Sequence, residues 1–180
     1  LDFDSLKKMG AMIGSGGLVI MDEETCMVEV ARFFMNFTQN ESCGKCVPCR
    51  EGTKRMLEIL EDIVAGKGTM EQLDILQELG EAITDTALCG LGKSAALPVL
   101  STLKLFRDEY EEHVLQKKCR TGTCQAMRTY RIDAELCKGC SKCARNCPVN
   151  AITGELKKPY VIDADKCIKC GACESNCPFG

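Results

Sequence analysis

No stretch of the 180 residues approaches the run of about eighteen apolar residues that a membrane-spanning helix needs. The chain starts at Leu1 without a methionine, and it has no basic segment followed by an apolar one, as a secretory signal would have. No basic stripe accompanies the formal net charge of −3, which argues against a nucleic-acid partner. We therefore expect a cytoplasmic protein without membrane insertion. The ends at Leu1 and Gly180 lead us to expect a piece of a longer polypeptide.

Residues for acid–base or nucleophilic catalysis are also scarce. His113 is the only histidine, and no nucleophile–base constellation surrounds it in the sequence. Four glycines in residues 10–17 precede an apolar run, but the G-x-G-x-x-G pattern of dinucleotide-binding turns is absent. Over residues 1–21 we expect the end of an upstream domain, a turn entering a short strand, and we expect no catalytic residue in the chain.

Cysteine is the residue type in excess. The chain has 15 cysteines, an odd number, and many of them are spaced as C-x2-C. Cysteines at that spacing bind a metal more often than they form a disulfide with each other, so a disulfide scaffold is disfavoured. With 45% hydrophobic residues the chain is globular. Thiolate-bound clusters would add negative charge and make the loaded protein distinctly acidic.

Eight of the cysteines form two runs of the pattern C-x2-C-x2-C-x3-C-Pro. The runs are Cys137, Cys140, Cys143, Cys147 with Pro148, and Cys167, Cys170, Cys173, Cys177 with Pro178. Other residues repeat at the same interval of thirty: Tyr130/Tyr160, Ile132/Ile162, Asp133/Asp163, Ala134/Ala164 and Asn146/Asn176. Two copies of one unit, each with four thiolates, suit a pair of 4Fe–4S clusters. The repeat also predicts short strands over residues 130–132 and 160–162 that pair with each other.

The shape of a cubane cluster predicts which cysteines act together. Three closely spaced cysteines wrap one face, and the fourth of each run is expected to reach the other cluster. The predicted sets are Cys137, Cys140, Cys143 and Cys177 for one cluster, and Cys167, Cys170, Cys173 and Cys147 for the other. Gly139 and Gly171 would let backbone N–H groups approach the sulfides. Zinc in one or both sites is the alternative, since four cysteines can also enclose zinc.

Upstream of the repeat the hydrophobic period is helical. Apolar residues at intervals of three and four predict four helices, with Phe37 on the apolar face of the first. Thr69 and Gln72 resemble a capping box at the start of the third helix, and Pro98 suits the first turn of the fourth, which runs to Val114.

These patterns predict a mainly α protein with a small α+β domain. A four-helix bundle is expected over residues 22–116, with a turn at residues 88–92, and the resemblance of residues 43–52 given below adds one 4Fe–4S cluster to it. A linker or hinge is expected over 117–129, where periodicity is lost. A two-cluster domain, similar to bacterial ferredoxins, is expected over 130–180.

Residues 130–180 resemble a bacterial ferredoxin domain with two 4Fe–4S clusters. Residues 43–52, CGKCVPCREG, resemble the iron–sulfur loop in the NADH-oxidising flavoprotein subunit of respiratory complex I. In that family three cysteines of the loop and one further along hold a 4Fe–4S cluster. The resemblance places this cluster on Cys43, Cys46, Cys49 and Cys89. The alternative is a three-cysteine zinc site or an inert loop.

The tandem order of the two cluster domains resembles the flavoprotein (beta) subunit of NAD(P)-linked, electron-bifurcating iron–iron hydrogenases. The resemblance implies an oxidoreductase subunit that relays electrons through three 4Fe–4S clusters. It implies FMN and NAD(P) sites upstream, with none in these residues. The implied partners are a hydrogenase catalytic subunit and a small 2Fe–2S thioredoxin-like subunit, with ferredoxin as a further candidate. The flavoproteins of NAD(P)-dependent formate dehydrogenases share the order and are the alternative.

Three cysteines and the histidine remain: Cys26, Cys119, Cys124 and His113. The start of the first helix and the end of the fourth fall at the same end of an up-down bundle, so these residues are expected together. Three cysteines and one histidine suit a structural zinc ion. The alternatives are a small buried Cys26 beside a solvated His113, or a 2Fe–2S cluster.

Two broader hypotheses also follow from the sequence. In one, the linker is a hinge and the ferredoxin half is a mobile shuttle between partners. In the other, zinc occupies every site and the chain is a zinc-stapled structural or interaction module.

Overall fold

The structure, a computed structural model, describes residues 2–8 and 19–179. Its contacts divide the chain into two compact units, Leu1–Cys124 and Gln125–Gly180, which we call the helical unit and the cysteine-rich unit. The glycines of residues 10–17 lie outside the described residues. Residues 19–21 form neither helix nor strand, so the short strand predicted to follow the glycines is wrong over that part.

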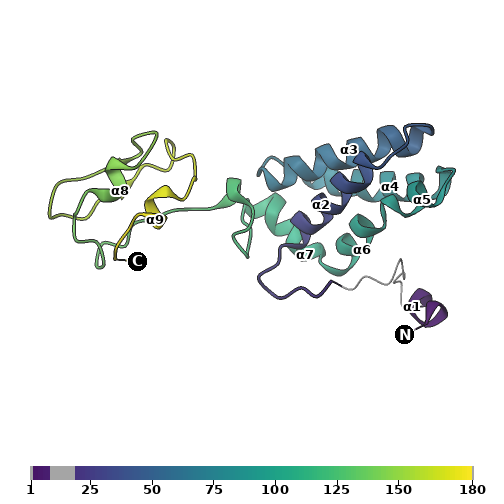
Figure 1. Cartoon of the computed structure of the whole chain (residues 1–180), viewed down its shortest axis with the longest axis horizontal. Helices are drawn as coiled ribbons and strands as arrows, with labels where there is room; N and C mark the ends of the chain where they lie inside the picture. Colours follow the sequence, from purple (N-terminus) through teal and green to yellow (C-terminus); the bar gives the residue numbers. More distant parts are fainter. Residues whose placement is uncertain (1, 9–18, 180) are drawn as a thin grey trace. The chain divides into compact units, whose positions relative to one another are not determined.

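From residue 27 to residue 116 the helical unit consists of helices joined by short loops, and another helix precedes them (Figure 1). They are α1 (Phe3–Lys8), α2 (Met27–Asn40), α3 (Val47–Val64), α4 (Met70–Thr86), α5 (Gly90–Ala95), α6 (Leu97–Leu105), α7 (Arg107–Glu111) and the π-helix η1 (Glu112–Gln116). Helix α2 packs against α3 and α6, and α4 packs against α3, α5 and α6, so these helices enclose a common interior. Among residues 2–8 and 19–179, no helix combines the length and apolarity that a membrane crossing needs.

Local sequence sets several helix ends. Thr69 Oγ1 accepts the N–H of Gln72 at 3.3 Å, and Gln72 Oε1 accepts the N–H of Thr69 at 2.9 Å, so the predicted capping box begins α4. Pro48 lies in the first turn of α3, where no backbone N–H is needed. Helix α3 ends at Val64, and Gly66 follows with a φ of 76°, in the left-handed region that is common just after a helix end.

The interior of the helical unit is apolar and closely packed. Its fully buried side chains come from α2, α3, α4, α6 and α7: Val28, Met35, Met56, Leu60, Leu76, Ile83, Val99 and Tyr110. The hydroxyl of Tyr110 hydrogen-bonds to Thr102 Oγ1 at 2.8 Å, so burial leaves that polar atom paired. Phe37, predicted to face this interior, is 54% exposed, because the buried face of α2 runs through Ala31 and Met35.

The single helix predicted over residues 98–114 is interrupted. Helix α6 ends at Leu105, and Phe106 leaves the helical conformation with φ −131° and ψ 37° before α7 begins at Arg107. The turn predicted over residues 88–92 is also wrong in part, because the short helix α5 begins at Gly90. Neither glycine nor proline marks the break at Phe106, so the apolar pattern continues across it and conceals it.

Residues 117–124 belong to the helical unit, although the sequence placed them in a linker. Lys117 Nζ donates a hydrogen bond to the carbonyl of Gly68 at 2.6 Å. Arg120 pairs with Glu112 at 2.7 Å. These contacts fold the segment back onto the end of η1 and onto the loop between α3 and α4.

The cysteine-rich unit has little regular structure. Its elements are the 3₁₀ turn η2 (Gln125–Met127), α8 (Lys142–Arg145), α9 (Ala172–Ser175), β1 (Ile152–Thr153) and β2 (Val161–Ile162). The two strands are antiparallel, with Ile152 opposite Ile162 and Thr153 opposite Val161. The strand predicted over residues 130–132 is wrong, because β2 takes β1 as its partner and residues 130–132 form no strand.

The internal repeat is nevertheless visible in the backbone. The equivalent residues Gly139 and Lys169 have φ values of 66° and 57°, and the equivalent residues Ser141 and Gly171 have 61° and 77°. Both copies therefore make the same left-handed turns around their second and third cysteines. Each copy has one glycine at these positions, and the two glycines stand at different turns.

We expect Gly139→Ala to destabilise the metal-loaded cysteine-rich unit more than Gly171→Ala. Each alanine would bear the strain of a positive φ, about 1–2 kcal/mol. At Gly139 the new Cβ would also lie 2.5 Å from the backbone N of Lys158 and 2.6 Å from that of Lys157. At Gly171 its nearest neighbour is the Tyr130 hydroxyl, 3.0 Å away, which a small ring movement relieves.

The measurement is the thermal melting temperature of each loaded variant, with iron content as the check on loading. Equal melting temperatures for the two alanine variants would show that the close approach of Gly139 to the backbone does not matter.

Candidate metal centres

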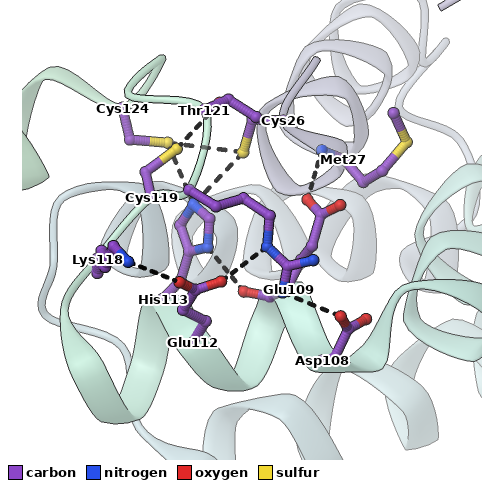
Figure 2. Close-up of polar contacts among 11 residues, drawn as sticks. Cys26, Met27, Asp108, Glu109, Glu112, His113, Lys118, Cys119, Thr121 and Cys124 are labelled. Carbon is purple, nitrogen blue, oxygen red and sulfur yellow. Dashed lines mark hydrogen bonds and ion pairs between the residues drawn. The ribbon is translucent and has the colours of Figure 1, made fainter. Parts of the chain in front are cut away.

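Cys26, His113, Cys119 and Cys124, which the sequence predicted as one site, lie together in the helical unit (Figure 2). One donor atom from each lies within 4.8 Å of all the others, and the four side chains are buried. Within residues 2–8 and 19–179, no other group of three or more Cys, His, Asp or Glu side chains gathers so closely. We call this group the Cys3His cluster.

The distances in the Cys3His cluster suit one tetrahedral ion. His113 Nε2 lies 3.4 Å from Sγ of both Cys26 and Cys124, and these two sulfurs are 3.8 Å apart. An ion with Zn–S bonds of about 2.3 Å and a Zn–N bond of about 2.0 Å would hold two sulfurs about 3.8 Å apart and a sulfur and a nitrogen about 3.5 Å apart. Four donors would fill the coordination shell, so the site suits a structural ion rather than one that binds substrate.

The ring of His113 is oriented by the backbone. Its Nδ1 lies 2.7 Å from the carbonyl oxygen of Glu109, which can only accept, so Nδ1 carries the hydrogen and donates it. The unprotonated nitrogen of the neutral ring is then Nε2, which faces the sulfurs. A second partner of this kind is what fixes metal-binding histidines in position.

Cys26, His113 and Cys124 shift one another's pKa values. In the metal-free chain the hydrogen bond from Cys124, helped by His113, lowers the pKa of Cys26 to about 4 against the cost of burial. The pKa of Cys124 is raised, because it donates to the charged sulfur of Cys26. Burial alone would lower the pKa of His113, but hydrogen bonding to Cys26 and to the Glu109 carbonyl raises it to about 9. A bound cation would displace these protons and balance the negative charge of the thiolates.

Cys26 is free to face the cluster because another residue caps its helix. It occupies the N-cap of α2, where Ser, Thr or Asp would normally bond to the first turn, and it makes no side-chain cap hydrogen bond. The buried carboxylate of Glu109 accepts the N–H of Met27 at 3.1 Å instead. Glu109 thus serves α2 through its side chain and His113 through its carbonyl (Figure 2).

The segment that carries Cys119 is held by ion pairs. Arg120 reaches back to Glu112 at 2.7 Å and to Asp108 at 2.9 Å. The guanidinium group lowers the pKa of the Asp108 carboxyl through its hydrogen bond. Burial alone would raise the pKa of the Cys119 thiol, but hydrogen bonds lower it, the first of them with Thr121 Oγ1 at 3.3 Å.

Two neighbouring segments of the helical unit hold the four cysteines that the resemblance assigns to one cluster. Cys46 is the N-cap of α3, Cys49 is buried in its first turn, and Cys89 is the N-cap of α5. Backbone N–H groups of Leu88 and Cys49 lower the pKa of Cys46. A Cβ on Gly92 would lie 3.4 Å from Cys49 Cβ, so α5 packs directly against the first turn of α3. The fourth cysteine, Cys43, is exposed at the start of the loop.

The first cavity of the cysteine-rich unit has a volume of about 410 Å³. Cys137, Cys140, Cys143 and Cys177 all line it, and these are the four predicted to share a cluster. Cys173 of the other set also reaches its wall. A cubane holds its thiolates farther apart than a single ion does, since each thiolate binds a different iron.

A second cavity in the same unit is much smaller, about 20 Å³. Cys147, Cys167, Cys170 and Cys173 line it, and these are the four predicted for the other cluster. In both cavities the fourth cysteine of one run lies with the first three of the other, which is the crossed arrangement expected from the sequence. Burial raises the pKa of Cys143 and of Cys173, so these thiols favour the protonated form until a cation is bound.

Sequence reasoning did not single out Glu109, Arg120 or Thr121. Glu109 stands four residues before His113, which is the spacing that brings its carbonyl to the ring, but its side chain meets α2 only through the fold. Arg120 and Thr121 adjoin Cys119, yet nothing in the local pattern distinguishes them from surface residues.

Two protein families match the chain. Residues 29–113 match the NADH-ubiquinone oxidoreductase-F iron-sulfur binding region. Residues 136–180 match the 4Fe-4S dicluster domain. The chain is therefore similar to two kinds of iron–sulfur domain in tandem, and these matches support the predicted 4Fe–4S and electron-transport character.

Curated relatives agree with these matches. The chain is 53% identical over 159 residues to the HndC subunit of the NADP-reducing hydrogenase of Solidesulfovibrio fructosivorans, which covers 88% of the chain and 32% of that protein. It is 44% identical over 119 residues to the F subunit of the NADH-quinone oxidoreductase of Streptomyces coelicolor, covering 66% of the chain and 26% of the relative.

A solved structure is also similar. The crystal structure of an NAD+-reducing [NiFe]-hydrogenase in the H2-reduced state matches 58% of the chain and 18% of its own chain, with 34% identity and a TM-score of 0.55. The present chain thus spans less than a third of the length of each of these three proteins. It is similar to the iron–sulfur portions of NAD(P)-linked oxidoreductase subunits.

We expect Glu109→Ala to destabilise the helical unit by about 2–3 kcal/mol, because it leaves the buried N–H of Met27 without an acceptor. Glu109→Gln should cost less, about 1 kcal/mol, since an amide oxygen can still accept. Asp108→Asn is the matched control on the same helix, and it should stay close to wild type because the Asp108 carboxylate is exposed.

Urea unfolding followed by far-ultraviolet circular dichroism gives the free energies. A Glu109→Ala variant as stable as Asp108→Asn would contradict the capping role of Glu109.

Proposed function

We propose that this chain relays electrons through three 4Fe–4S clusters, because it joins an iron–sulfur region of the NADH-ubiquinone oxidoreductase-F type to a 4Fe–4S dicluster domain. The observation that carries the proposal is that each of two cavities is lined by one crossed set of four cysteines, with Cys173 of the second set also on the wall of the first cavity. No proton-transfer residue is required for such a relay, and none of the three sites is built around one.

The site geometry and the family resemblance support the following assignment of ligands. Cys43, Cys46, Cys49 and Cys89 hold one cluster in the helical unit; the cysteine-rich unit holds the others, on Cys137, Cys140, Cys143, Cys177 and on Cys167, Cys170, Cys173, Cys147. Such clusters supply one-electron transfer at potentials that their surroundings tune between roughly −700 and +450 mV. The chain contributes their spacing and the N–H groups and charges around them.

Backbone N–H groups favour the charged form of one ligand in the helical unit. Cys46 stands at the N-cap of α3 and Cys89 at the N-cap of α5, and the N–H groups of Leu88 and Cys49 lower the pKa of Cys46. The packing of α5 against the first turn of α3 through Gly92 keeps these two N-termini close to each other. The same contacts that build the helical interior therefore support thiolate ligation.

For the parent protein we propose the flavoprotein subunit of an NAD(P)-linked, electron-bifurcating iron–iron hydrogenase. The similarity to the HndC subunit extends over 159 residues, whereas that to the F subunit from Streptomyces coelicolor extends over 119, which favours the type with an appended dicluster domain. FMN and NAD(P) would then bind outside these residues. A hydrogenase catalytic subunit and a 2Fe–2S thioredoxin-like subunit would be partners, and an NAD(P)-dependent formate dehydrogenase flavoprotein is the second candidate.

The Cys3His cluster is proposed to hold a structural zinc ion. Its donor spacing and closed, buried geometry suit zinc, and it joins α2, η1 and residues 117–124 at one point. A zinc ion there would fix the end of the helical unit without carrying electrons, because zinc has no accessible redox change.

The electron-relay proposal is tested by iron content and redox titration. The loaded chain should contain about twelve iron atoms, and electron paramagnetic resonance should resolve three reducible 4Fe–4S centres. Cys89→Ala should remove about four iron atoms and one centre while leaving the other two intact. Iron without any reducible centre, or full iron content in Cys89→Ala, would contradict the proposal.

The zinc proposal is tested by metal analysis of the same chain. Wild type should contain about one zinc ion, and His113→Ala should lose at least about tenfold in zinc affinity, because one of four donors is removed. Thr121→Ala, a neighbour that is no expected donor to the ion, should retain the metal. A folded wild-type chain with no zinc would end this assignment.

A further inference from the structure

The two copies of the repeat have similar acids but different bases. In the first copy Arg131, Lys138, Lys142 and Arg145 are basic; the equivalent residues of the second copy are Val161, Ile168, Ala172 and Ser175. The acids Asp133 and Glu135 have counterparts in Asp163 and Asp165. The second copy has the bases Lys166 and Lys169 and the further acid Glu174, so the excess of positive charge belongs to the first copy alone.

This positive charge surrounds one of the two cavities. Arg131, Lys138 and Lys142 line the first cavity, and we call these three residues the basic rim. Lys157 is close by, because its backbone N–H bonds to the carbonyl of Gly139 at 3.1 Å. The lining of the second cavity contains no charged side chain and includes Val149 and Ile168 instead.

The basic rim is not used to hold the fold together. Arg131, Lys138 and Lys142 are exposed, and their side chains make no ion pair or hydrogen bond within residues 2–8 and 19–179. By contrast, Lys158 pairs with Glu155 at 2.7 Å and Lys166 with Asp163 at 3.3 Å. The cations of the rim therefore remain available to another molecule.

Acidic groups near the first cavity offset the rim only in part. Asp133 and Glu174 also line the cavity, and Asp133 already accepts the N–H of Glu135 at 2.8 Å. Three cations against two carboxylates leave a positive balance of the side chains, to which the exposed Lys157 and Arg145 add. The five bases together also offset the charge of about −2 that a cluster with four thiolates would bring. Across the whole cysteine-rich unit there are nine lysines and arginines and six acids, although the complete chain is acidic at −3.

We propose that the basic rim is the docking surface for an acidic electron-carrier protein, which approaches the first cavity and not the second. The inference rests on the proposed function, since the rim surrounds the site assigned to Cys137, Cys140, Cys143 and Cys177. Complementary charge steers such partners into register and speeds their encounter. A rim of exposed bases beside one cavity, with an apolar rim at its counterpart, gives the two halves of the repeat different roles.

The test is binding of a purified acidic ferredoxin with two 4Fe–4S clusters to the complete, iron-loaded chain. The variant Lys138→Gln/Lys142→Gln removes two rim charges. The matched control Lys158→Gln/Lys166→Gln removes the same charge from outside both cavity linings. At low ionic strength the rim variant should bind about tenfold more weakly, and the control should stay within about twofold of wild type. The difference should shrink as salt is raised.

Three results would overturn docking at the rim. One is equal affinity of the rim and control variants. Another is an equal loss of affinity for a DNA oligonucleotide, which would mean general attraction of anions. The third is an altered self-association of the rim variant with unaltered ferredoxin binding, which would make a second copy the occupant.

Redox titration of the same samples separates this inference from the proposed function. A wild-type chain without reducible iron would remove the proposed function and the docking inference together. Reducible centres with no rim effect on binding would remove only the docking inference. A shifted cluster potential in the rim variant with unaltered ferredoxin binding would assign the bases to potential tuning and would also overturn docking.

Discussion

Convergence of thiolates on metal is the interaction on which we propose that the cysteine-rich unit depends. Very few of its side chains are buried, chiefly Met127, Ala151, Ile152 and Tyr160. Two residues in each strand and four in each of α8 and α9 add little local stability. So small an apolar core cannot offset the conformational entropy of the unit, and metal–sulfur bonds would have to supply the difference.

The helical unit is stabilised differently, because it has a large apolar interior of its own. That interior fixes the axes of α2, α3 and α5, and each of these helices begins at a cysteine: Cys26, Cys46 and Cys89. At one of these positions the backbone N–H groups of Leu88 and Cys49 lower the pKa of Cys46. Packing of the helices therefore determines where these sulfurs lie. Glu109 completes this arrangement by capping α2, which leaves Cys26 free for the Cys3His cluster.

The two halves of the repeat show how similar backbones can acquire different surfaces. The left-handed turns at residues 139 and 169, and again at 141 and 171, are shared. The exposed side chains around them are not, because the backbone fixes the positions of the cysteines but leaves the outward side chains unconstrained. Lys138 and Ile168 occupy equivalent places, so a polar and an apolar rim can be built on the same turn.

The sequence by itself determined the features that depend on local spacing. The capping box at Thr69, the helical period and the duplicated cysteine runs follow from intervals of a few residues or from the repeat. The grouping of Cys26 with His113, which are 87 residues apart, followed instead from the expected up-down order of the helices. Tertiary structure alone decided the break at Phe106, the pairing of β2 with β1, and the contact between Glu109 and Met27. These features depend on packing between segments that are distant in the sequence. The pattern of neighbouring residues does not specify such contacts.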